Sequence, residues 1–435
     1  MDKQTEVDGA QEIAGDAVFV SQYFPPFNAV ASQRALRIAR VLLNNFNHVY
    51  VITLPIHHLP DEYIDREFAK DILSDPRLRV VQVSPLLEGY GFVDRPRAAH
   101  RLLGAVMTRI LCSSGGDWLR PLSKALKAIQ EKARLRFIMT TGGPFIPFLV
   151  VTNFAHKAKL PCIIDYRDLW SDNPRAPYPK LFRFLIKNTV ERYVNGRCAV
   201  ITTVSEGCRR ILVSSRPRSD VRILPNTPDR AYRVWFDGHA PSSDCDFDYG
   251  SLNVVLAGTV YRECTCRIFV EAISLLPPVV RQKIKLHYYG SSSELVKRDF
   301  LRTGNSANLN DHGLVRKGDA VAAVKSADVL LSLVCDLKEC EDAAMTGVMT
   351  TKIFDYFLSG KPVINIGPPN ADVNLFAKKI GYKEFHSFSS SEVYKLSKYL
   401  IGAVSDLSRF RAHQVHVDIP DFGQALQQIL HDAQN

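Results

Sequence analysis

The stretch LPCIIDYRDLW, residues 160–170, carries the pattern on which the fold prediction rests. Residues 162–165 form a short apolar run typical of a buried strand, and the turn that follows is polar and aromatic. Similar runs occur at residues 137–140 and 200–204, and each run precedes a helical stretch. Strands that alternate with helices predict parallel β-α-β units with right-handed crossovers.

The same alternation extends over most of the 435 residues. Further strands are expected at residues 17–23, 48–54 and 78–83, with helices at 28–46, 97–112 and 118–134. A stretch rich in Asp, Ser, Pro and Gly interrupts the pattern at residues 233–250, and a second series of strands and helices follows. We therefore predict an α/β protein with two Rossmann-like, doubly wound domains that face a cleft, and with helices at the C-terminus.

The predicted domain boundaries follow these breaks in the pattern. The expected order is a polar N-terminal tail at 1–16, a first domain at 17–232, a linker at 233–250, a second domain at 251–405 and C-terminal helices at 406–435 that pack back on the first domain. Ligands of open α/β sheets bind beyond the carboxyl ends of the strands. The default site is therefore the predicted cleft between the two domains.

Charge is distributed unevenly along the chain. Residues 1–233 carry 34 basic and 22 acidic residues, whereas residues 234–435 carry 21 and 23. A basic first half favours an anionic partner, such as a membrane surface or a phosphorylated substrate. Nucleic acid is not expected, because the basic half shows neither interleaved exposed aromatic residues nor a known binding module. The nine cysteines lack metal-ligand spacing and are interpreted as reduced thiols of a cytosolic protein.

Two segments bear on membrane insertion. The N-terminal residues are polar and acidic and do not resemble a signal peptide. Residues 137–156 carry no charge and are long enough to span a bilayer, but they contain two glycines and two prolines. A strand, a turn and the start of a helix explain this segment better than a membrane span.

The motifs of several common enzyme classes are missing from the sequence. It contains no G-x-G-x-x-G after a strand, no Walker A sequence and no G-x-S-x-G elbow. The remaining candidates are loops at predicted strand ends, such as TTGGPF at 140–145, where glycines allow a close approach of the backbone to a ligand. Asp165, Arg167 and Asp168 form a second candidate, for which a structural ion-pair network is the alternative interpretation. Lys352 and Asp355, on a predicted helix, could hold a phosphate and a ribose diol, or they could belong to a capped surface helix.

Taken together and in order, these segments resemble glycosyltransferase family 4, whose members are retaining, nucleotide-sugar-dependent enzymes of the GT-B architecture. The matching segments include YFPP at 23–26, TTGGPF, LPCIIDYRDLW, ITTVSEGCRRIL, VVLAGTVYRECTCRIFVEAISLL and TTKIFDYFLSGKPVINIG. The resemblance covers roughly residues 17–430. It implies that the first domain binds the acceptor and the second the nucleotide-sugar donor, with no cofactor and no metal.

The resemblance also implies roles for single residues. The expected catalytic residues are Asp168, Arg167 and Asp165. The expected donor-binding residues are Gly258, Thr259, Arg262, Gly290, Gly313, Val315, Thr351, Lys352 and Asp355. The expected acceptor-binding residues are Pro26, Asn28, Arg34, Gly142 and Gly143.

The chain departs from the family pattern at three positions. Gly347 stands where the family commonly has a glutamate, and Thr259 and Cys264 stand where it usually has Arg and Lys. A diphosphate leaving group needs stabilisation of its charge, so Arg262 and Lys352 are the nearest candidates to replace these cations.

The function expected from the resemblance is the transfer of a sugar from a UDP- or GDP-sugar to a lipid-linked or polysaccharide acceptor, with retention of configuration, in cell-surface glycan biosynthesis. The alternatives are a nucleotide-sugar epimerase of the same architecture and a non-catalytic scaffold with this fold. The expected location is the cytoplasmic face of a membrane, where the protein attaches peripherally.

Attachment is expected chiefly through residues 97–112 and the basic helix that follows. On a helical wheel, one side of this segment is apolar (Ala99, Leu102, Leu103, Val106, Met107, Ile110), and Arg97, Arg101 and Arg109 lie opposite. An anionic membrane surface is therefore a predicted partner. The alternative interpretation is a helix packed on the core with a solvated basic face.

Overall fold

The structure is a computed structural model. It describes residues 13–28, 30–59, 64–66, 69–86, 98–173, 178–215, 219–241, 247–262, 264–334, 347, 349–412 and 414–434. The chain forms two compact units. Unit 1 comprises Met1–Asn226 and Phe422–Asn435, and unit 2 comprises Thr227–Asp421.

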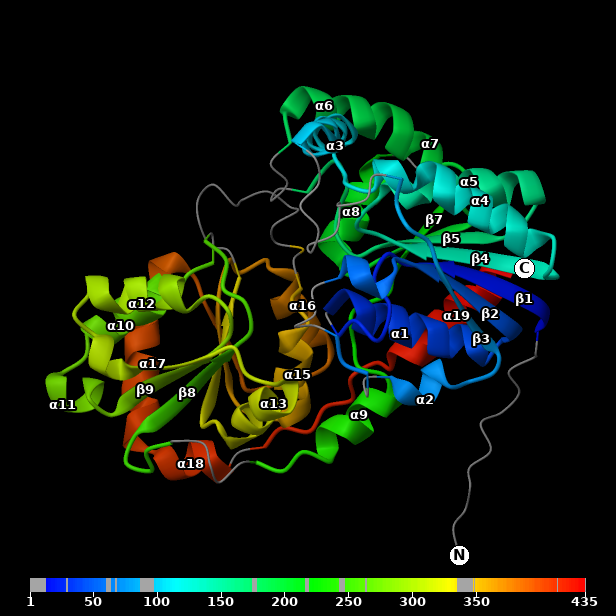
Figure 1. Ribbon diagram of the computed structural model, residues 1–435. Coiled ribbons are helices and arrows are strands. Elements are labelled where there is room, and N and C mark those ends of the chain that lie inside the picture. Colours follow the sequence, from blue (N-terminus) through cyan, green and yellow to red (C-terminus); the bar gives the residue numbers. More distant parts are fainter. Residues whose placement is uncertain are drawn as a thin grey trace, which may run out of the picture. The chain divides into compact units, whose positions relative to one another are not determined.

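Unit 1 is built on a parallel sheet of seven strands in the order β3-β2-β1-β4-β5-β6-β7 (Figure 1). The strands are β1 (Ile13–Val20), β2 (Phe46–Thr53), β3 (Leu78–Gln82), β4 (Leu135–Thr141), β5 (Cys162–Tyr166), β6 (Val200–Thr203) and β7 (Asp220–Ile223). Strand order reverses between β1 and β4, as expected for a doubly wound sheet. Every residue of β5 is buried, which agrees with the apolar run in the sequence.

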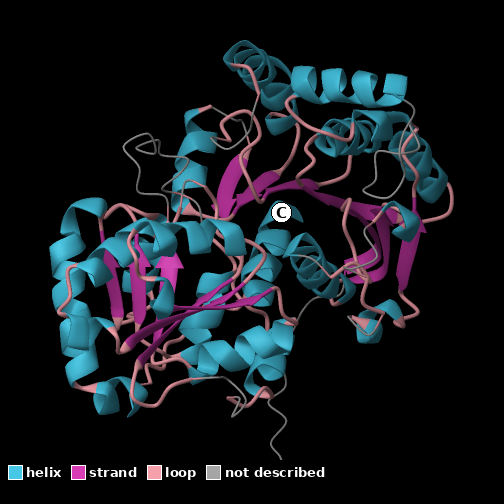
Figure 2. Ribbon diagram, turned by 60° about the vertical axis from the view of Figure 1, so that its left-hand side comes forward, coloured by secondary structure: helices cyan, strands magenta, loops and turns pink. Residues whose placement is uncertain are grey.

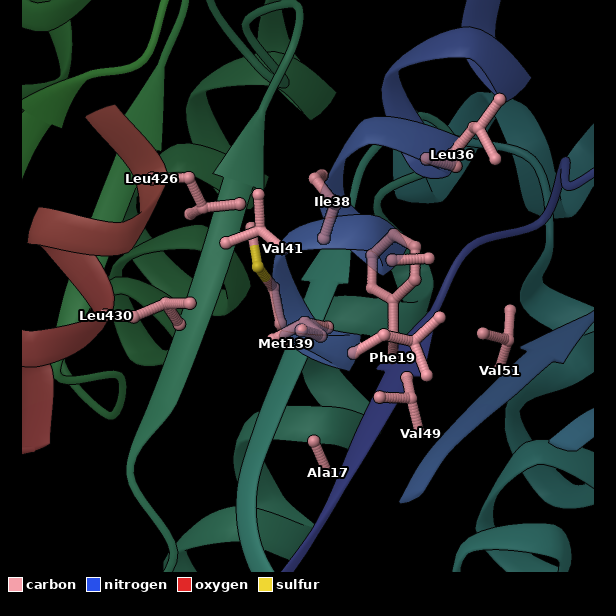
Figure 3. Close-up of a cluster of buried hydrophobic side chains, with 14 of the residues drawn as sticks. Ala17, Phe19, Leu36, Ile38, Val41, Val49, Val51, Met139, Leu426 and Leu430 are labelled. Atoms are coloured by element: carbon pink, nitrogen blue, oxygen red, sulfur yellow. The ribbon is translucent and has the colours of Figure 1, made fainter. Parts of the chain in front are cut away.

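Helices cover both faces of this sheet. The helices are α1 (Val30–Leu43), α2 (Lys70–Leu73), α3 (Ala98–Leu111), α4 (Leu119–Gln130), α5 (Ile146–Ala158), α6 (Lys180–Ile186), α7 (Arg192–Asn195), α8 (Glu206–Ser214) and α19 (Phe422–Gln434). The C-terminal α19 packs on α1, and Leu426 and Leu430 enter the same apolar cluster as Phe19 and Val41 (Figure 3). The end of the chain therefore completes the core of unit 1.

Unit 2 has a parallel sheet of six strands in the order β10-β9-β8-β11-β12-β13. The strands are β8 (Leu252–Ala257), β9 (Ile284–Tyr289), β10 (Leu309–Gly313), β11 (Val329–Leu333), β12 (Val363–Ile366) and β13 (Phe385–Phe388). The helices are α9 (Arg230–Asp237), α10 (Arg267–Ser274), α11 (Pro278–Arg281), α12 (Ser293–Arg302), α13 (Lys317–Ser326), α15 (Lys352–Ser359), α16 (Asp372–Lys379), α17 (Val393–Ser405) and α18 (Leu407–Ala412). Helices flank the strands of this sheet (Figure 2). Two apolar clusters combine residues of the sheet with residues of these helices.

The structure differs from the sequence expectations at several segment boundaries. Unit 2 begins at Thr227, before the expected linker, and it includes α18, so of the expected C-terminal helices only α19 belongs to unit 1. The strand β1 begins at Ile13, inside the expected polar tail, because Asp16 finds polar partners on the neighbouring β2 and just before β4. Its carboxylate accepts a hydrogen bond from the Arg134 N–H (2.9 Å) and lies 2.9 Å from Nδ1 of His48. Helix α9 occupies the first residues of the expected linker, because Asp229 caps it by accepting from the Tyr232 N–H at 2.8 Å.

The uncharged segment at residues 137–156 forms most of β4, a turn and most of α5. In the part of the chain that the structure describes, no helix combines the length and apolar character needed to cross a bilayer.

Candidate functional site

In unit 1, Asp165 and Arg34 form a buried ion pair at the carboxyl end of β5. Arg34, on α1, donates from Nε and Nη2 to the two carboxylate oxygens at 2.8 and 2.6 Å. Thr141 and Thr202 donate their hydroxyls to the same carboxylate at 2.7 Å each. Burial alone would raise the pKa of Asp165, but the charge and hydrogen bonds of Arg34, with the two threonines, hold it below its usual value.

The two predicted site residues of this pair are buried and bind other groups of the protein. Asp165 has 0% exposed surface and Arg34 has 2%. Arg34 also donates to the Leu224 carbonyl at 3.0 Å and to Oδ1 of Asn226 at 2.8 Å. Both side chains are thus engaged with the protein itself, and they join α1, β5 and the segment after β7. The structural network that the sequence allowed as an alternative exists, but its cation is Arg34.

Arg167 turns instead toward the glycine loop after β4. Its guanidinium donates to the Gly142 carbonyl and, at 2.9 Å, to the Gly143 carbonyl. Burial lowers the pKa of Arg167, while the carboxylate of Asp168 acts in the opposite direction. The turn after β5 is therefore joined to the loop after β4, which brings the predicted catalytic residue Arg167 together with the predicted acceptor-binding residues Gly142 and Gly143.

The packing of this loop explains one of its glycines. A Cβ atom on Gly142 would lie 2.6 Å from Phe148 and 2.7 Å from Phe145, so the loop has no room for a side chain there. The ring of Phe145 stacks on Trp170 with centroids 5.5 Å apart. Trp170 is buried, and its indole donates to the Leu111 carbonyl at 3.1 Å. Asp168, between Arg167 and Trp170 in the sequence, has an exposed side chain.

The other predicted acceptor-binding residues lie in the loop after β1. The Pro26 carbonyl accepts from the Asp65 N–H at 2.9 Å, and the Asn28 amide donates to the Asp65 carboxylate at 3.3 Å. An isolated bridge between Phe27 and Ile64 holds the same loop. This loop thus has a defined position at the carboxyl edge of the sheet, one strand away from the loop after β4.

In unit 2, the structure brings three of the predicted donor-binding glycines together. Gly290 donates to the Gly313 carbonyl at 2.7 Å, and Gly258 donates to the Tyr289 carbonyl at 2.7 Å. A Cβ atom on Gly290 would lie 2.4 Å from the Gly258 carbonyl oxygen. Gly258 and Gly313 have φ angles of 95° and 65°, which favour glycine. The carboxyl ends of β8, β9 and β10 therefore form one surface of bare backbone.

Lys352 extends from the start of α15 toward this glycine surface. Its Nζ lies 3.4 Å from the Thr259 carbonyl oxygen, and its Cδ would meet a Cβ on Gly258 at 3.5 Å. Burial lowers the pKa of Lys352 to about 8, although the neighbouring Cys266 and Cys264 thiols act in the opposite direction. The amine is thus mostly protonated at neutral pH and is an incompletely solvated cation.

Asp355, one turn further along α15, has partners that the sequence analysis missed. Tyr232 donates its hydroxyl to Oδ1 at 2.7 Å, and the Lys317 ammonium pairs with Oδ2. The carboxylate is buried, and a ribose diol would have to share it with these two donors. No sequence motif marks Tyr232, which lies 123 residues before Asp355. Lys317 is four residues after Gly313, close to the expected donor-binding residues Gly313 and Val315.

The remaining predicted donor residues occupy less enclosed positions. Arg262 lies exposed on a turn that the Cys264 N–H closes on the Tyr261 carbonyl at 3.0 Å. Val315 packs partly against the apolar cluster beneath α13 and α15. Thr351 precedes α15 without a side-chain capping bond, and most of that helix is buried, so it is not a capped surface helix. Gly347 is described, but residues 335–346, which precede it, lie outside the described residues.

An aromatic stack supports the Gly313 turn from below. Tyr289 and His312 are stacked with centroids 4.3 Å apart, and Nε2 of His312 lies 3.1 Å from Nδ1 of His287. Burial, with His312 and Lys285, lowers the pKa of His287 to about 4, so this ring is neutral. The stack fixes His312 beside the backbone that the resemblance assigns to the donor.

A separate surface of unit 1 exposes apolar side chains. We call it the α3–α6 surface, because α3 and α6 lie side by side there (Figure 1). It consists of Val106, Ile110, Leu181, Phe184 and Leu185, of which Leu181 and Phe184 are each 65% exposed. Two exposed cations lie on the same helices, Arg109 on α3 and Lys180 on α6. Arg97 and the side chain of Arg101 lie outside the described residues.

The basic helix after α3 does not belong to this surface. In α4, Leu122, Leu126 and Ile129 are buried, whereas Lys124 and Lys127 are exposed. This is a core-packed helix with a solvated basic face. For α4 the alternative interpretation therefore describes the structure. In α3, Val106 and Ile110 are exposed, as is Arg109.

Comparisons with known proteins address the fold. No protein-family model matches the sequence, and no curated protein matches it. Solved structures do: sucrose-phosphate synthase from Thermosynechococcus elongatus is 12% identical, with a TM-score of 0.58 over 97% of this chain and 95% of that one. HepE of Anabaena, solved in complex with UDP, is 11% identical, with a TM-score of 0.59 over 97% and 96%. WaaG, a glycosyltransferase involved in lipopolysaccharide biosynthesis, is 11% identical, with a TM-score of 0.52 over 96% and 95%.

The chain has the GT-B fold. These likenesses extend over nearly the whole length of both chains in each comparison, so they include the two sheets and the helices around them. The fold expectation from the sequence, two Rossmann-like doubly wound sheets of the GT-B architecture, is thus confirmed. At these identities the likeness concerns the fold and leaves the roles of single residues as predictions.

Proposed function

We propose that this protein is a glycosyltransferase that transfers a sugar from a nucleoside diphosphate sugar, a UDP- or GDP-sugar, to an acceptor with retention of configuration. The observation that supports it most is the bare backbone of Gly258, Gly290 and Gly313 beside the Lys352 amine, on the GT-B fold. A diphosphate is served by both features, because glycines allow it to approach the backbone closely and the amine stabilises the charge that grows as it leaves.

In this proposal unit 2 binds the donor. Lys352 stabilises the diphosphate leaving group, and Arg262, exposed on the next turn, adds a second positive charge. Asp355 accepts hydrogen bonds from the ribose hydroxyls, and Lys317 and Tyr232 hold its carboxylate in place. These groups act by charge and hydrogen bonding, and no metal or cofactor is assigned to the site. In the described parts of the chain, no cluster of His, Cys, Asp and Glu has the arrangement of a metal site.

Unit 1 binds the acceptor. Asp168 is the exposed carboxylate of the turn after β5 and is proposed to accept a proton or a hydrogen bond from the acceptor hydroxyl. Arg167 holds the glycine loop, and the pair Arg34–Asp165 fixes the strand that carries this turn. The resemblance gives Asp165 a catalytic role. In this proposal Asp165 is instead a positioning residue, because it holds the strand that carries Asp168.

The donor assignment can be tested by calorimetry with UDP and GDP. In Asp355→Ala, the affinity should fall by roughly 1.5–3 kcal/mol, the value of a hydrogen bond to a charged acceptor. Asp319→Ala, at an exposed carboxylate in the first turn of α13, serves as the matched control and should bind like the wild type. Unchanged affinity of Asp355→Ala for every nucleotide bound by the wild type would remove Asp355 from the site.

The reaction itself is tested by incubation with nucleotide sugars. Release of the nucleoside diphosphate, with transfer to an added acceptor or to water, supports a transferase. Formation of a soluble isomer of the nucleotide sugar would identify an epimerase instead. Binding without any turnover, with or without acceptor, would identify a scaffold.

We further propose that the acceptor is lipid-linked and that the protein reaches it by peripheral attachment to the cytoplasmic face of an anionic membrane. The α3–α6 surface supports this, because it combines exposed apolar side chains with cations, the pattern of an interfacial element. Each cation near an anionic surface contributes about 1 kcal/mol. The role of WaaG in lipopolysaccharide biosynthesis is consistent with a lipid-linked acceptor.

Vesicle co-sedimentation tests the attachment. The wild type should bind vesicles that contain anionic lipid, and binding should weaken at high salt. Phe184→Glu should reduce binding, while Leu301→Glu, at a leucine of α12 that is 67% exposed, is the matched control and should bind normally. If the wild type stays in the supernatant with anionic vesicles at low salt, the attachment proposal fails.

A further inference from the structure

The helix that follows the turn of residues 167–170 contains a local irregularity. Between α6 and α7, residues Lys187–Glu191 form a π-helical turn, so the helix runs without interruption from 180 to 195. A π-helical turn inserts one extra residue into a helix and is frequently found at functional sites. Here it carries Glu191 to the inner side, where only 5% of the residue is exposed.

The buried carboxylate of Glu191 binds the residue directly after this turn. Its Oε2 accepts the Ser171 hydroxyl and, at 3.3 Å, the Ser171 N–H. The same helix makes two more contacts with this short segment. Arg183 donates to the Ser171 carbonyl at 2.6 Å, and Lys187 pairs with Asp172 at 2.7 Å.

The other end of the turn is bound by the same helix. Tyr166, the residue before Arg167, donates its hydroxyl to Oδ1 of Asn195 at 2.8 Å. The residues directly before and after the turn of residues 167–170 are thus bonded to one helix. Ser171 is the anchor of the turn on its C-terminal side. None of these helix contacts is part of the site described above.

We propose that Glu191 is a positioning residue for the proposed reaction, which fixes the turn of residues 167–170 through Ser171 and releases it when its carboxyl group takes up a proton. This inference rests on the proposed function of Arg167 and Asp168. An ionised carboxylate accepts both Ser171 donors in charge-assisted hydrogen bonds, whereas a protonated carboxyl group is an uncharged and weaker acceptor. The ionised form therefore holds the turn more firmly.

The surroundings place this change near neutral pH. Burial raises the pKa of Glu191 to about 7, and Asp172 adds to the rise, while the Ser171 bonds and Lys187 oppose it. The other titratable groups with an electrostatic effect in this cluster are Tyr166 on β5, Cys112 after α3 and Arg183 on the helix itself. Because burial keeps Tyr166 and Cys112 protonated, Glu191 is the group that titrates near neutral pH.

The test uses the full-length protein labelled with 5-fluorotryptophan, which has three tryptophans and therefore three fluorine signals. The Trp170 signal, assigned with Trp170→Phe, should shift with a midpoint near pH 7 in the wild type. In Glu191→Gln this shift should be absent, whereas the matched control Glu206→Gln, at a partly exposed glutamate of α8, should keep it. Ser171→Ala leaves Glu191 in place but removes the hydroxyl through which Glu191 holds the turn. The pH-dependent shift of the Trp170 signal should therefore also be reduced in this variant.

Turnover gives a second, separate readout. In the wild type kcat should rise from pH 6 to pH 8 through the same midpoint, and in Glu191→Gln this step should be lost. A Trp170 signal that does not respond to pH, or that responds equally in Glu191→Gln, overturns the inference even if the enzyme is active. If no donor is turned over but the Trp170 shift depends on Glu191, the proposed function fails while the coupling stands.

Discussion

Replacement of Asp165 by Asn separates a positioning role from a catalytic one. The substitution keeps the size of the side chain but removes its charge and replaces one acceptor oxygen with a donor. Four donors from Arg34, Thr141 and Thr202 then face a group that can accept only some of them. The Arg34 charge, 2% exposed, is left without a counterion.

The expected loss follows from the burial of this pair. Removal of one partner of a buried ion pair costs about 3–5 kcal/mol. For a unit of this size, each kcal/mol lowers Tm by about 2–4 °C. Asp165→Asn should therefore melt about 6–20 °C below the wild type at neutral pH. Since the pKa of Asp165 is depressed, the pair is intact at that pH, and its contribution is lost only in acid as pH falls through the folded-state pKa.

The matched control is Asp168→Asn in the same turn. Asp168 is exposed, and surface substitutions usually change stability by no more than about 0.5 kcal/mol. It should melt like the wild type but lose turnover. Calorimetric melting and a transfer assay on the same preparations measure both quantities. The reasoning is refuted if Asp165→Asn melts like the wild type, or if Asp168→Asn loses stability while its turnover stays normal.

Two further substitutions give independent checks. Gly290→Ala should weaken UDP or GDP binding in calorimetry, because its Cβ would lie 2.4 Å from the Gly258 carbonyl oxygen. Gly304→Ala, where φ is positive but space is open, should lose stability only and keep its affinity. Glu191→Gln should change how stability depends on pH. Because burial raises the pKa of Glu191, the wild type should lose roughly 3 kcal/mol of unfolding free energy between about pH 4.5 and pH 8 relative to the variant. Urea titrations of both proteins at pH 5 and pH 8 measure this difference. The same change in unfolding free energy between the two pH values in both proteins would contradict it.

The fold was accessible from the sequence because apolar strands and polar strand ends alternate so regularly. The resemblance named Gly258, Gly290 and Gly313 together as donor-binding residues, and in the structure their backbones meet because the parallel strands β8, β9 and β10 end along one edge. The wheel pattern of residues 97–112 likewise indicated an exposed apolar helix face, and Val106 and Ile110 are exposed.

The pairing of charged groups could not be read from the sequence. Arg34 and Asp165 are 131 residues apart, and nothing in either segment indicates that Arg34 rather than Arg167 is the partner. Asp355 was identified as a candidate, but its contacts with Lys317 and Tyr232 depend on how α9 and α13 pack on α15. Glu191 belongs to no motif, and its burial results from a π-helical turn that no periodicity predicts.

The return of α19 to unit 1 has a consequence for synthesis on the ribosome. Residues 227–421 emerge as one uninterrupted stretch and can fold as soon as they are complete. Unit 1 begins first, yet it lacks Phe422, Leu426, Ile429 and Leu430 of its core until the end of the chain is made. At about 5–20 residues per second, the apolar face of α1 that receives α19 stays uncovered for about 10–40 s after residue 226 has been added. The unit whose synthesis starts first is thus the last to be finished, and during that interval it presents the surface that chaperones bind.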